Sequence, residues 1–227
     1  MRRDSKIVKS LVLILVVAMT AAAFSACRAD LGKFETVIFG EFEQDGKLEN
    51  GQEPLEWIVL ERTADEVVLT TKYGVFSKDY YIGSTKKGAV VSYDTSSLRK
   101  WMRNTFYKKA FSEEQRKFFI TKSFKDEVTG KTVNDPVLLM TVEEAEKYFA
   151  SDKERLLEET TYANLAKAYK NTFTQSGWWW LLDMGTEKES SAAFVNSFGK
   201  VMPGGNYACY EHALIRPIIH VKPEALQ

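Results

Sequence analysis

The chain has 227 residues, and its 31 Lys and Arg are balanced by 31 Asp and Glu. A net charge of zero argues against a nucleic-acid-binding protein, because phosphates demand a basic surface, and against a polybasic membrane-binding patch. The sequence contains only two cysteines, which are too few for a zinc site built from several thiolates.

The first 27 residues follow the order of an export signal. Four basic residues lie within residues 2–9, residues 10–26 carry no charge, and the small residues Ser25 and Ala26 lead to Cys27. This order is typical of a signal peptide with a small-residue processing site. Because a cysteine follows the cleavage position directly, the segment resembles the lipobox of bacterial lipoproteins, with Phe24 where leucine is usual.

The lipobox resemblance implies that residues 1–26 are removed and that Cys27 is acylated with a diacylglycerol and a palmitate-like chain. Two or more acyl chains hold a protein stably in a bilayer, so we expect a lipid anchor on the extracytoplasmic face of the cell membrane. Two alternatives stay open. A retained span would need about 20 apolar residues, and Leu11–Ala26 offers 16. Cleavage without lipidation is the other.

The exported part is long enough for one domain with a sizeable core. Removing residues 1–26 takes away four basic residues and one acidic residue, which leaves a net charge of −3. We predict a short tether at 27–34 and a single domain at 35–223. The six residues 28–33 span at most about 20 Å, so they confine the domain close to the bilayer. Cys209 would lack a disulfide partner, and we expect a small buried hydrophobic side chain there.

The first part of the domain favours β-structure. Apolar runs at 36–39 and 55–61 predict strands, separated by the turn-rich segment 44–51. Residues 66–71 predict a third strand, which forms a hairpin with the second. Residues 77–93 favour an irregular segment.

The middle of the domain favours helices. Residues 95–106 place four apolar side chains on one face, those of Leu98, Trp101, Met102 and Phe106. Asp94, Thr95 or Ser96 can cap this helix. Capping boxes at 112–115 and 141–144 begin two more helices, ending near Phe119 and Phe149. Residues 137–140 predict a strand, and residues 156–170 predict a further helix.

The last part returns to β-structure. Apolar runs predict strands at residues 177–182, 192–195 and 199–202. Pro203–Gly205 predicts a turn, and residues 213–221 predict a terminal strand. Pro217 within that strand indicates an edge position or a bulge. Strands at both ends with helices between them favour an α+β fold rather than alternating βαβ units.

Several motifs occur in an order associated with one bacterial family. They lie at residues 39–42, 55–60, 95–101, 106–112, 141–149, 176–179 and 215–217. On these motifs the chain resembles the domain of unknown function 6273, over about Phe39 to Val221. The resemblance implies a C-type-lectin-like fold shared with formylglycine-generating enzymes. In that fold the first and last strands pair, and short antiparallel strands at both ends flank three to four short helices. Its members occur largely in Firmicutes, on exported proteins, without established catalytic residues.

The tryptophans and the residues after them are the first candidate site. Side chains alternate along a strand, so Trp178 and Trp180 share a face. Two interpretations stay open for them, packing in the core and stacking on a sugar ring. The family commonly continues with Arg-Ser-Pro, where this chain has Leu182, Asp183 and Met184. Asp183 and Asn196 belong to an oxygen-rich loop that calcium could use, although their spacing matches no calcium loop. We therefore predict no cofactor.

Two further candidates lie near the C-terminus. Arg216 suits a structural pin that bonds carboxylates or carbonyls, or a ligand contact, because its guanidinium is a planar fork of donors. Cys209 and His212 are close in sequence, but adjacency is poor evidence for a catalytic pair. A lone cysteine also cannot reproduce the paired cysteines of formylglycine-generating enzymes, so we predict no catalytic residue and no metal.

The sequence favours a tethered, non-catalytic module that binds an extracellular glycan, cell-wall polymer or protein. The alternatives are an enzyme, or a degenerate relative of one, in the formylglycine-generating superfamily, and a structural partner in a membrane-proximal complex. The expected ligand-binding residues are Trp178, Trp180, Asp183, Asn196 and Arg216.

Overall fold

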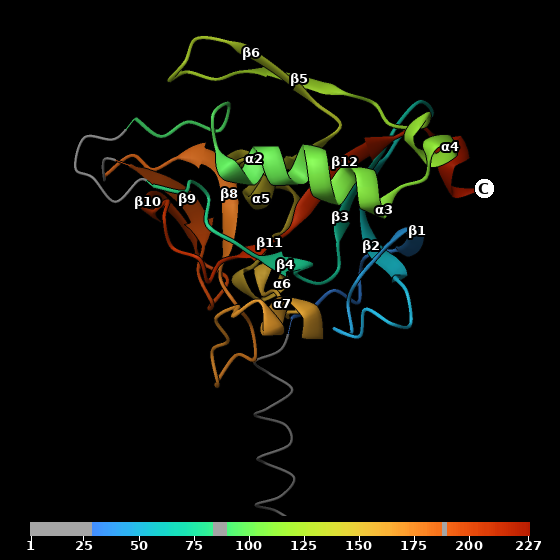
Figure 1. Cartoon of the computed structure of the whole chain (residues 1–227), viewed down its shortest axis with the longest axis horizontal. Coiled ribbons are helices and arrows are strands. Elements are labelled where there is room, and N and C mark those ends of the chain that lie inside the picture. Colours follow the sequence, from blue (N-terminus) through green and yellow to red (C-terminus); the bar gives the residue numbers. More distant parts are fainter. Residues whose placement is uncertain (1–28, 84–89, 188–189) are drawn as a thin grey trace, which may run out of the picture.

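The computed structural model describes residues 29–83, 90–187 and 190–227 (Figure 1). Cys27 and the expected signal peptide lie outside the described residues. The strands are β1 Thr36–Phe42, β2 Glu53–Arg62, β3 Val67–Thr71, β4 Phe76–Ser77, β5 Lys122–Lys125, β6 Thr132–Asp135, β7 Val137–Leu139, β8 Trp179–Met184, β9 Ser191–Val195, β10 Val201–Tyr207, β11 Leu214–Ile215 and β12 Pro217–Val221.

Two five-stranded sheets and one hairpin contain these strands. The first sheet has the order β1-β2-β3-β12-β7, the second has the order β10-β9-β8-β11-β4, and β5 pairs with β6. All pairings except that of β8 with β11 are antiparallel. The predicted α+β class with mostly antiparallel strands is therefore confirmed.

The described helices are short, and all lie between β4 and β8 except a 3-10 helix, Pro223–Leu226, that follows β12. Those between β4 and β8 are α2 Ser97–Trp101, a π-helical turn Met102–Phe106, α3 Tyr107–Ala110, α4 Glu113–Arg116, α5 Val142–Tyr148, α6 Asp152–Arg155 and α7 Thr161–Leu165. The described chain thus has more helical segments than the three to four expected. None of the helices in the described ranges has the length and apolar character that a membrane span requires.

Local sequence signals explain where several helices begin. The hydroxyls of Ser112 and Thr141 accept hydrogen bonds from the backbone at Gln115 and Glu144, whose side chains bond back to the caps. Both predicted capping boxes are therefore confirmed. Ser96, one of three predicted caps, begins α2.

The chain changes sheets at one residue near its end. Leu214 and Ile215 form β11 in the second sheet, and Pro217 begins β12 in the first. The predicted terminal strand is thus two strands, broken at Arg216. The prediction of an edge or bulge at Pro217 was wrong, because β12 lies between β3 and β7. Proline is tolerated there because it is the first residue of its strand.

Three other expectations need correction. Residues 156–170 are not one helix, because Leu157 is extended and forms a bridge with Gly177 before α7 begins. Pro203–Gly205 lies inside β10, where a register shift absorbs it, rather than in a turn. The β5–β6 hairpin was not predicted. Strand β12 pairs with β3 and β7, whereas β1 pairs with β2, so the first and last strands are not partners.

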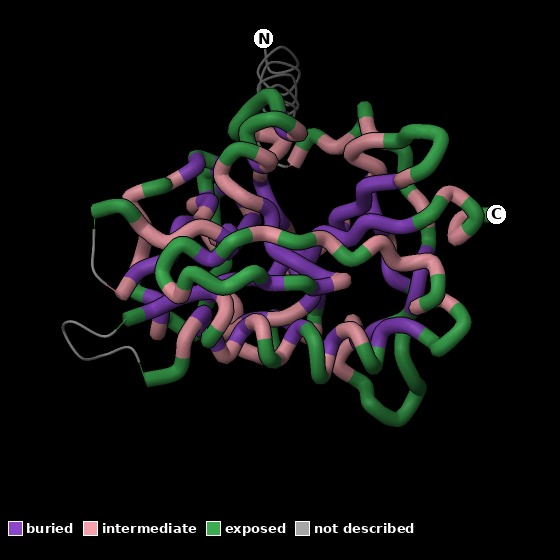
Figure 2. Tube along the Cα trace, turned by 90° about the horizontal axis from the view of Figure 1, so that it is seen from above, coloured by how far each residue is buried: buried purple, intermediate pink, exposed green. Residues whose placement is uncertain are grey.

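The residues predicted as a free tether are docked on the domain. Leu31 and Phe34 pack against the hydrophobic core, and the amide of Asp30 donates to the carbonyl oxygen of Lys153 in α6. The core itself is one cluster that runs from Phe39 to Val221. In Figure 2 the buried stretches of the described chain run through its middle, with exposed loops around them.

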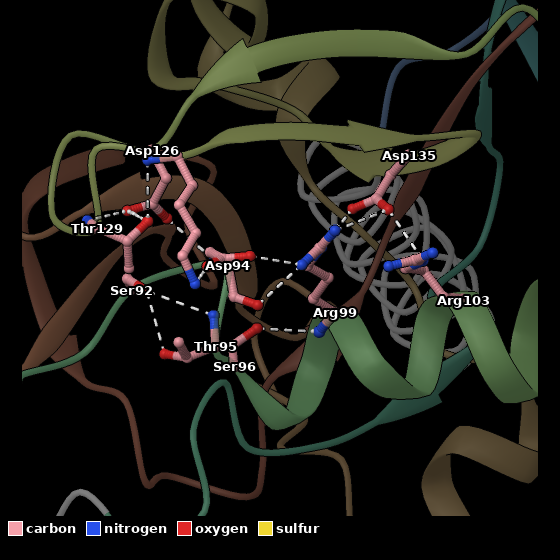
Figure 3. Close-up of polar contacts among 10 residues, drawn as sticks. Ser92, Asp94, Thr95, Ser96, Arg99, Arg103, Asp126, Thr129 and Asp135 are labelled. Atoms are coloured by element: carbon pink, nitrogen blue, oxygen red, sulfur yellow. Dashed lines mark hydrogen bonds and ion pairs between the residues drawn. The ribbon is translucent and has the colours of Figure 1, made fainter.

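A buried ion-pair network attaches the β5–β6 hairpin to α2 (Figure 3). The Nε of Arg99 lies 2.6 Å from Asp135, and its Nη1 lies 2.7 Å from Asp94. Arg103 contacts the same Asp135 carboxylate at 3.1 Å. Asp126, at the hairpin turn, accepts a hydrogen bond from the amide of Asp94. The Asp135 side chain is fully buried, and the two arginines compensate its negative charge.

We predict that Asp135→Asn lowers the free energy of unfolding by about 2 kcal/mol, because it removes the buried charge that bonds to Arg99 and Arg103, although Arg99 keeps its pair with Asp94. Urea unfolding followed by circular dichroism measures the loss. Asp65→Asn, on the exposed turn after β2, is the matched control and should change stability little. Equal stabilities of the two variants would contradict this account of the hairpin.

Candidate functional site

The three consecutive tryptophans, residues 178–180, lie mostly in the core. Trp180 is fully buried and its indole N–H donates to the carbonyl oxygen of Lys78. Trp178 lies on the same face, with its ring centroid 4.8 Å from that of Trp180, and it is half-buried against Phe194. Trp179 points the other way into the core, as strand alternation predicts. Only Trp178 keeps any accessible surface for a ligand.

The structure does not bring Asp183 and Asn196 together. Asp183 accepts a hydrogen bond from the amide of Val142 at the start of α5, where a negative charge is favourable. Asn196 accepts from the amides of Phe198 and Lys200 in the β9–β10 connection. The two residues lie near opposite ends of the β8–β9 pair. Both side chains therefore accept hydrogen bonds from the backbone of structural elements.

Arg216 is completely buried at the crossover between the sheets. Its Nε donates to the carbonyl oxygen of Thr71 at 3.1 Å. The guanidinium carbon lies 4.6 Å from the ring centroid of Phe149 and 5.3 Å from that of Trp179. Burial lowers the pKa of this guanidinium to about 9. Its Nη1 and Nη2 bond to no described residue, so one hydrogen bond and two ring faces hold the guanidinium in place.

Cys209 and His212 are not joined in a catalytic pair. Cys209 is half-buried rather than the fully buried side chain expected, because it lies in the exposed stretch after β10. His212 is exposed, and its Nδ1 lies 2.8 Å from the carbonyl oxygen of Lys167. That ring nitrogen is therefore not available to activate the thiol.

An aromatic hollow that sequence reasoning missed lies between β1, β4, the α2–α3 segment and α7. Its volume is about 170 Å³. Four rings line it, those of Phe42, Phe76, Trp101 and Tyr162. The remaining lining residues are Glu43, Leu48, Gly51, Gln52, Thr105 and Lys109. We call this site the aromatic hollow.

The π-helical turn shapes one wall of the aromatic hollow. The amide of Tyr107 bonds to the carbonyl of Met102, five residues earlier, so residues five apart come nearly into line. Trp101 and Phe106 consequently stack, with centroids 5.8 Å apart and planes 25° apart. Trp101 also stacks on Phe76 at 5.2 Å. Such π-helical turns occur frequently at functional sites.

A bulge in β1 supplies the opposite wall. The β1–β2 register shifts between Ile38 and Glu41, and Gly40 there has a φ of +74°. A Cβ at this position would lie 2.5 Å from the carbonyl oxygen of Ala110, so only glycine fits. After the bulge, Phe42 and Glu43 are both buried, and both line the aromatic hollow.

Polar groups accompany the four rings. Glu43 is 5% exposed and accepts a hydrogen bond from the amide of Gly46 at 2.7 Å. The indole N–H of Trp101 and the hydroxyl of Tyr162 bond to no other described residue. The aromatic hollow therefore combines apolar ring surface with donors and a carboxylate acceptor.

Three carboxylates lie next to the aromatic hollow. Oxygen atoms of Glu43, Asp45 and Glu53 lie within 4.8 Å of one another. Each carboxylate also accepts a backbone hydrogen bond, from Gly46, Lys47 and Gln44 respectively. They are the described residues that could best hold a cation, at a place different from the predicted acidic loop.

A second hollow of about 310 Å³ lies between β5 and β12 and contains His220. The Nδ1 of His220 bonds to Glu66, which also pairs with Lys122 at 2.7 Å. Burial lowers the pKa of His220, although the hydrogen bond to Glu66 acts in the opposite direction. The hydroxyls lining this hollow bond to Asn134 and Glu144 instead, so the described residues form no nucleophile–base pair here.

A family model, described as "Domain of unknown function (DUF6273)", matches residues 64–223. The chain belongs to this family. The match begins later than the expected Phe39, so β1 and β2 precede it. Neither the curated proteins nor the solved structures contain a match to the chain.

Only some residues that line the aromatic hollow fall within the DUF6273 match. Phe76, Trp101 and Tyr162 lie within the matched region, whereas Phe42 and Glu43 come from the segment that precedes it. The one sequence signal for the site was the apolar face of residues 95–106, which the fold confirms. The π-helical turn and the β1 bulge, which turn part of that face into a lined hollow, have no simple sequence signature.

Proposed function

We propose that this chain is an extracytoplasmic lipoprotein, tethered through acylated Cys27, whose DUF6273 domain binds a glycan without catalysis. The observation that carries the binding proposal is the aromatic hollow. Its volume of about 170 Å³ is below the roughly 300–1,000 Å³ of pockets for drug-sized ligands. The aromatic hollow would therefore accept a single ring of a larger ligand.

The lining suits a sugar ring. A sugar has apolar C–H surface, which packs on aromatic side chains, and hydroxyls, which need donors and acceptors. Phe76 and Tyr162 offer partly exposed ring surface, while Glu43, Gln52 and Trp101 Nε1 offer polar partners. Lys109 adds a positive charge at the rim. A cell-wall glycan, which continues beyond one ring, is the ligand class that we propose.

The relation to the C-type-lectin-like fold is part of this proposal. The α+β class and the short, mostly antiparallel strands support it. The central position of β12, paired with β3 rather than β1, is where this chain would depart from that fold.

We predict that Trp101→Phe weakens glycan binding about tenfold, because it removes one hydrogen-bond donor worth roughly 1.4 kcal/mol while keeping an aromatic ring. The full chain, solubilised in detergent, is screened on arrays of glycans and cell-wall fragments, and the affinity for each hit is then measured. Trp178→Phe is the matched control and should leave the affinity unchanged.

Two outcomes of that screen count against the proposal. A loss with Trp178→Phe but not with Trp101→Phe would move the site to the second sheet. An absence of binding by the wild-type chain to every glycan and cell-wall fragment would refute the ligand class.

The tether has a separate test. Cys27→Ser removes the acceptor thiol, so we expect the protein to leave the membrane fraction or to accumulate as an uncleaved precursor. Fractionation of expressing bacteria followed by immunoblotting measures this. Cys209→Ser, which changes the other cysteine, should stay in the membrane fraction, and membrane retention of Cys27→Ser would refute lipidation.

A further inference from the structure

Large apolar side chains are exposed at one end of the domain. Four of them lie on α7 and on two loops beyond it: Leu165 at 64% exposure, Tyr169 at 46%, Phe173 at 66% and Phe198 at 56%. Isolated exposed apolar residues are normal, but a group of them marks an interaction surface. We call these four residues the apolar end.

The two phenylalanines are presented by well-bonded loops. The side chain of Asn171 accepts hydrogen bonds from the amides of Phe173 and Thr174. Asn196 does the same for Phe198. The hydroxyl of Thr174 donates to the carbonyl oxygen of Ser197 at 2.7 Å, which joins the two loops. These hydrogen bonds fix the backbones of Phe173 and Phe198, while both side chains remain exposed.

The loop that carries Phe198 packs directly on α6. The Nε of Arg155 donates to the carbonyl oxygen of Gly199 at 2.8 Å. A Cβ on Gly199 would lie 1.8 Å from the carbonyl oxygen of Asp152, so only glycine allows this approach. In Figure 1, α6 and α7 lie at the end of the domain opposite the β5–β6 hairpin.

The same helix holds the first described residues. The amide of Asp30 donates to the carbonyl oxygen of Lys153, and Lys33 pairs with Glu154 at 2.7 Å. Asp30 is three residues after Cys27. Even fully extended, these residues separate Cys27 from Asp30 by at most about 10 Å. A lipid on Cys27 would thus enter the bilayer close to α6 and to the Phe198 loop.

We propose that the apolar end lies against the lipid bilayer and fixes the orientation of the domain on the membrane. This inference rests on the proposed lipid tether and extends it. Phenylalanine, leucine and tyrosine gain free energy in the interfacial region, where aromatic residues are enriched. Two exposed lysines, Lys167 and Lys200, flank the apolar end and can face anionic headgroups, while Lys170 pairs with Glu159. The β5–β6 hairpin then points away from the bilayer.

Hydrogen–deuterium exchange of the full chain in lipid nanodiscs tests the contact, with discs of phosphatidylglycerol and phosphatidylethanolamine. We expect amides in residues 171–176 and 196–200 to exchange more slowly in the wild type than in the double variant Phe173→Ser, Phe198→Ser. Val128→Ser removes an exposed apolar side chain from the opposite hairpin, and this matched control should keep the protection. Unchanged exchange elsewhere would show that the double variant is folded.

Other outcomes overturn the proposal in distinguishable ways. Equal exchange of the two segments in wild type and double variant refutes the bilayer contact alone. Protection that requires two protein copies in one disc identifies a second copy as the occupant instead. A chain that does not associate with the discs refutes the tether together with the contact, and leaves glycan binding at the aromatic hollow as a separate question.

Discussion

The rest of the structure depends on the buried guanidinium of Arg216. The chain leaves one sheet at Ile215 and enters the other at Pro217, and Arg216 is the single residue between them. Its side chain lies between the rings of Phe149 and Trp179, and it bonds to the Thr71 carbonyl. A buried charge costs free energy unless its surroundings compensate it, so these neighbours must keep their places. One residue thereby sets how the two sheets meet.

Short series of contacts connect both the aromatic hollow and the apolar end to this crossover. Ile215 pairs with Phe76, which lines the aromatic hollow. On the other side, Phe149 contacts Phe34 at 5.7 Å, next to the docked N-terminal segment. The indole N–H of Trp179 bonds to Arg155 in α6, which supports the Phe198 loop. The aromatic hollow and the apolar end are thus held in a fixed relation by one core.

Local signals in the sequence were enough to predict much of this fold. The capping boxes at Ser112 and Thr141 begin helices because their hydrogen bonds form within four residues of chain. The apolar face of residues 95–106 and the alternation of Trp178 to Trp180 are likewise short-range patterns. The α+β class followed from them. The family match at residues 64–223 contains five of the seven motifs, and those at 39–42 and 55–60 precede it.

The features that build the site depend on long-range contacts instead. Pro217 suggests an edge strand by itself, yet tertiary pairing places β12 in the centre of a sheet. Phe42 reaches the aromatic hollow only because Gly40 lets β1 approach Ala110. Trp180 and Asp183 look available in sequence, but the core and the start of α5 occupy them. No local pattern distinguishes those outcomes.

Urea unfolding of Arg216→Lys tests the crossover most directly, because this substitution keeps a hydrogen-bond donor and removes the planar fork. Lysine cannot stack between two rings and also donate as Nε does, so we predict a loss of about 3 kcal/mol in the free energy of unfolding. Arg62→Lys, at an exposed ion pair with Glu35, should lose less than about 1 kcal/mol. Equally small losses for the two variants would contradict the role assigned to Arg216.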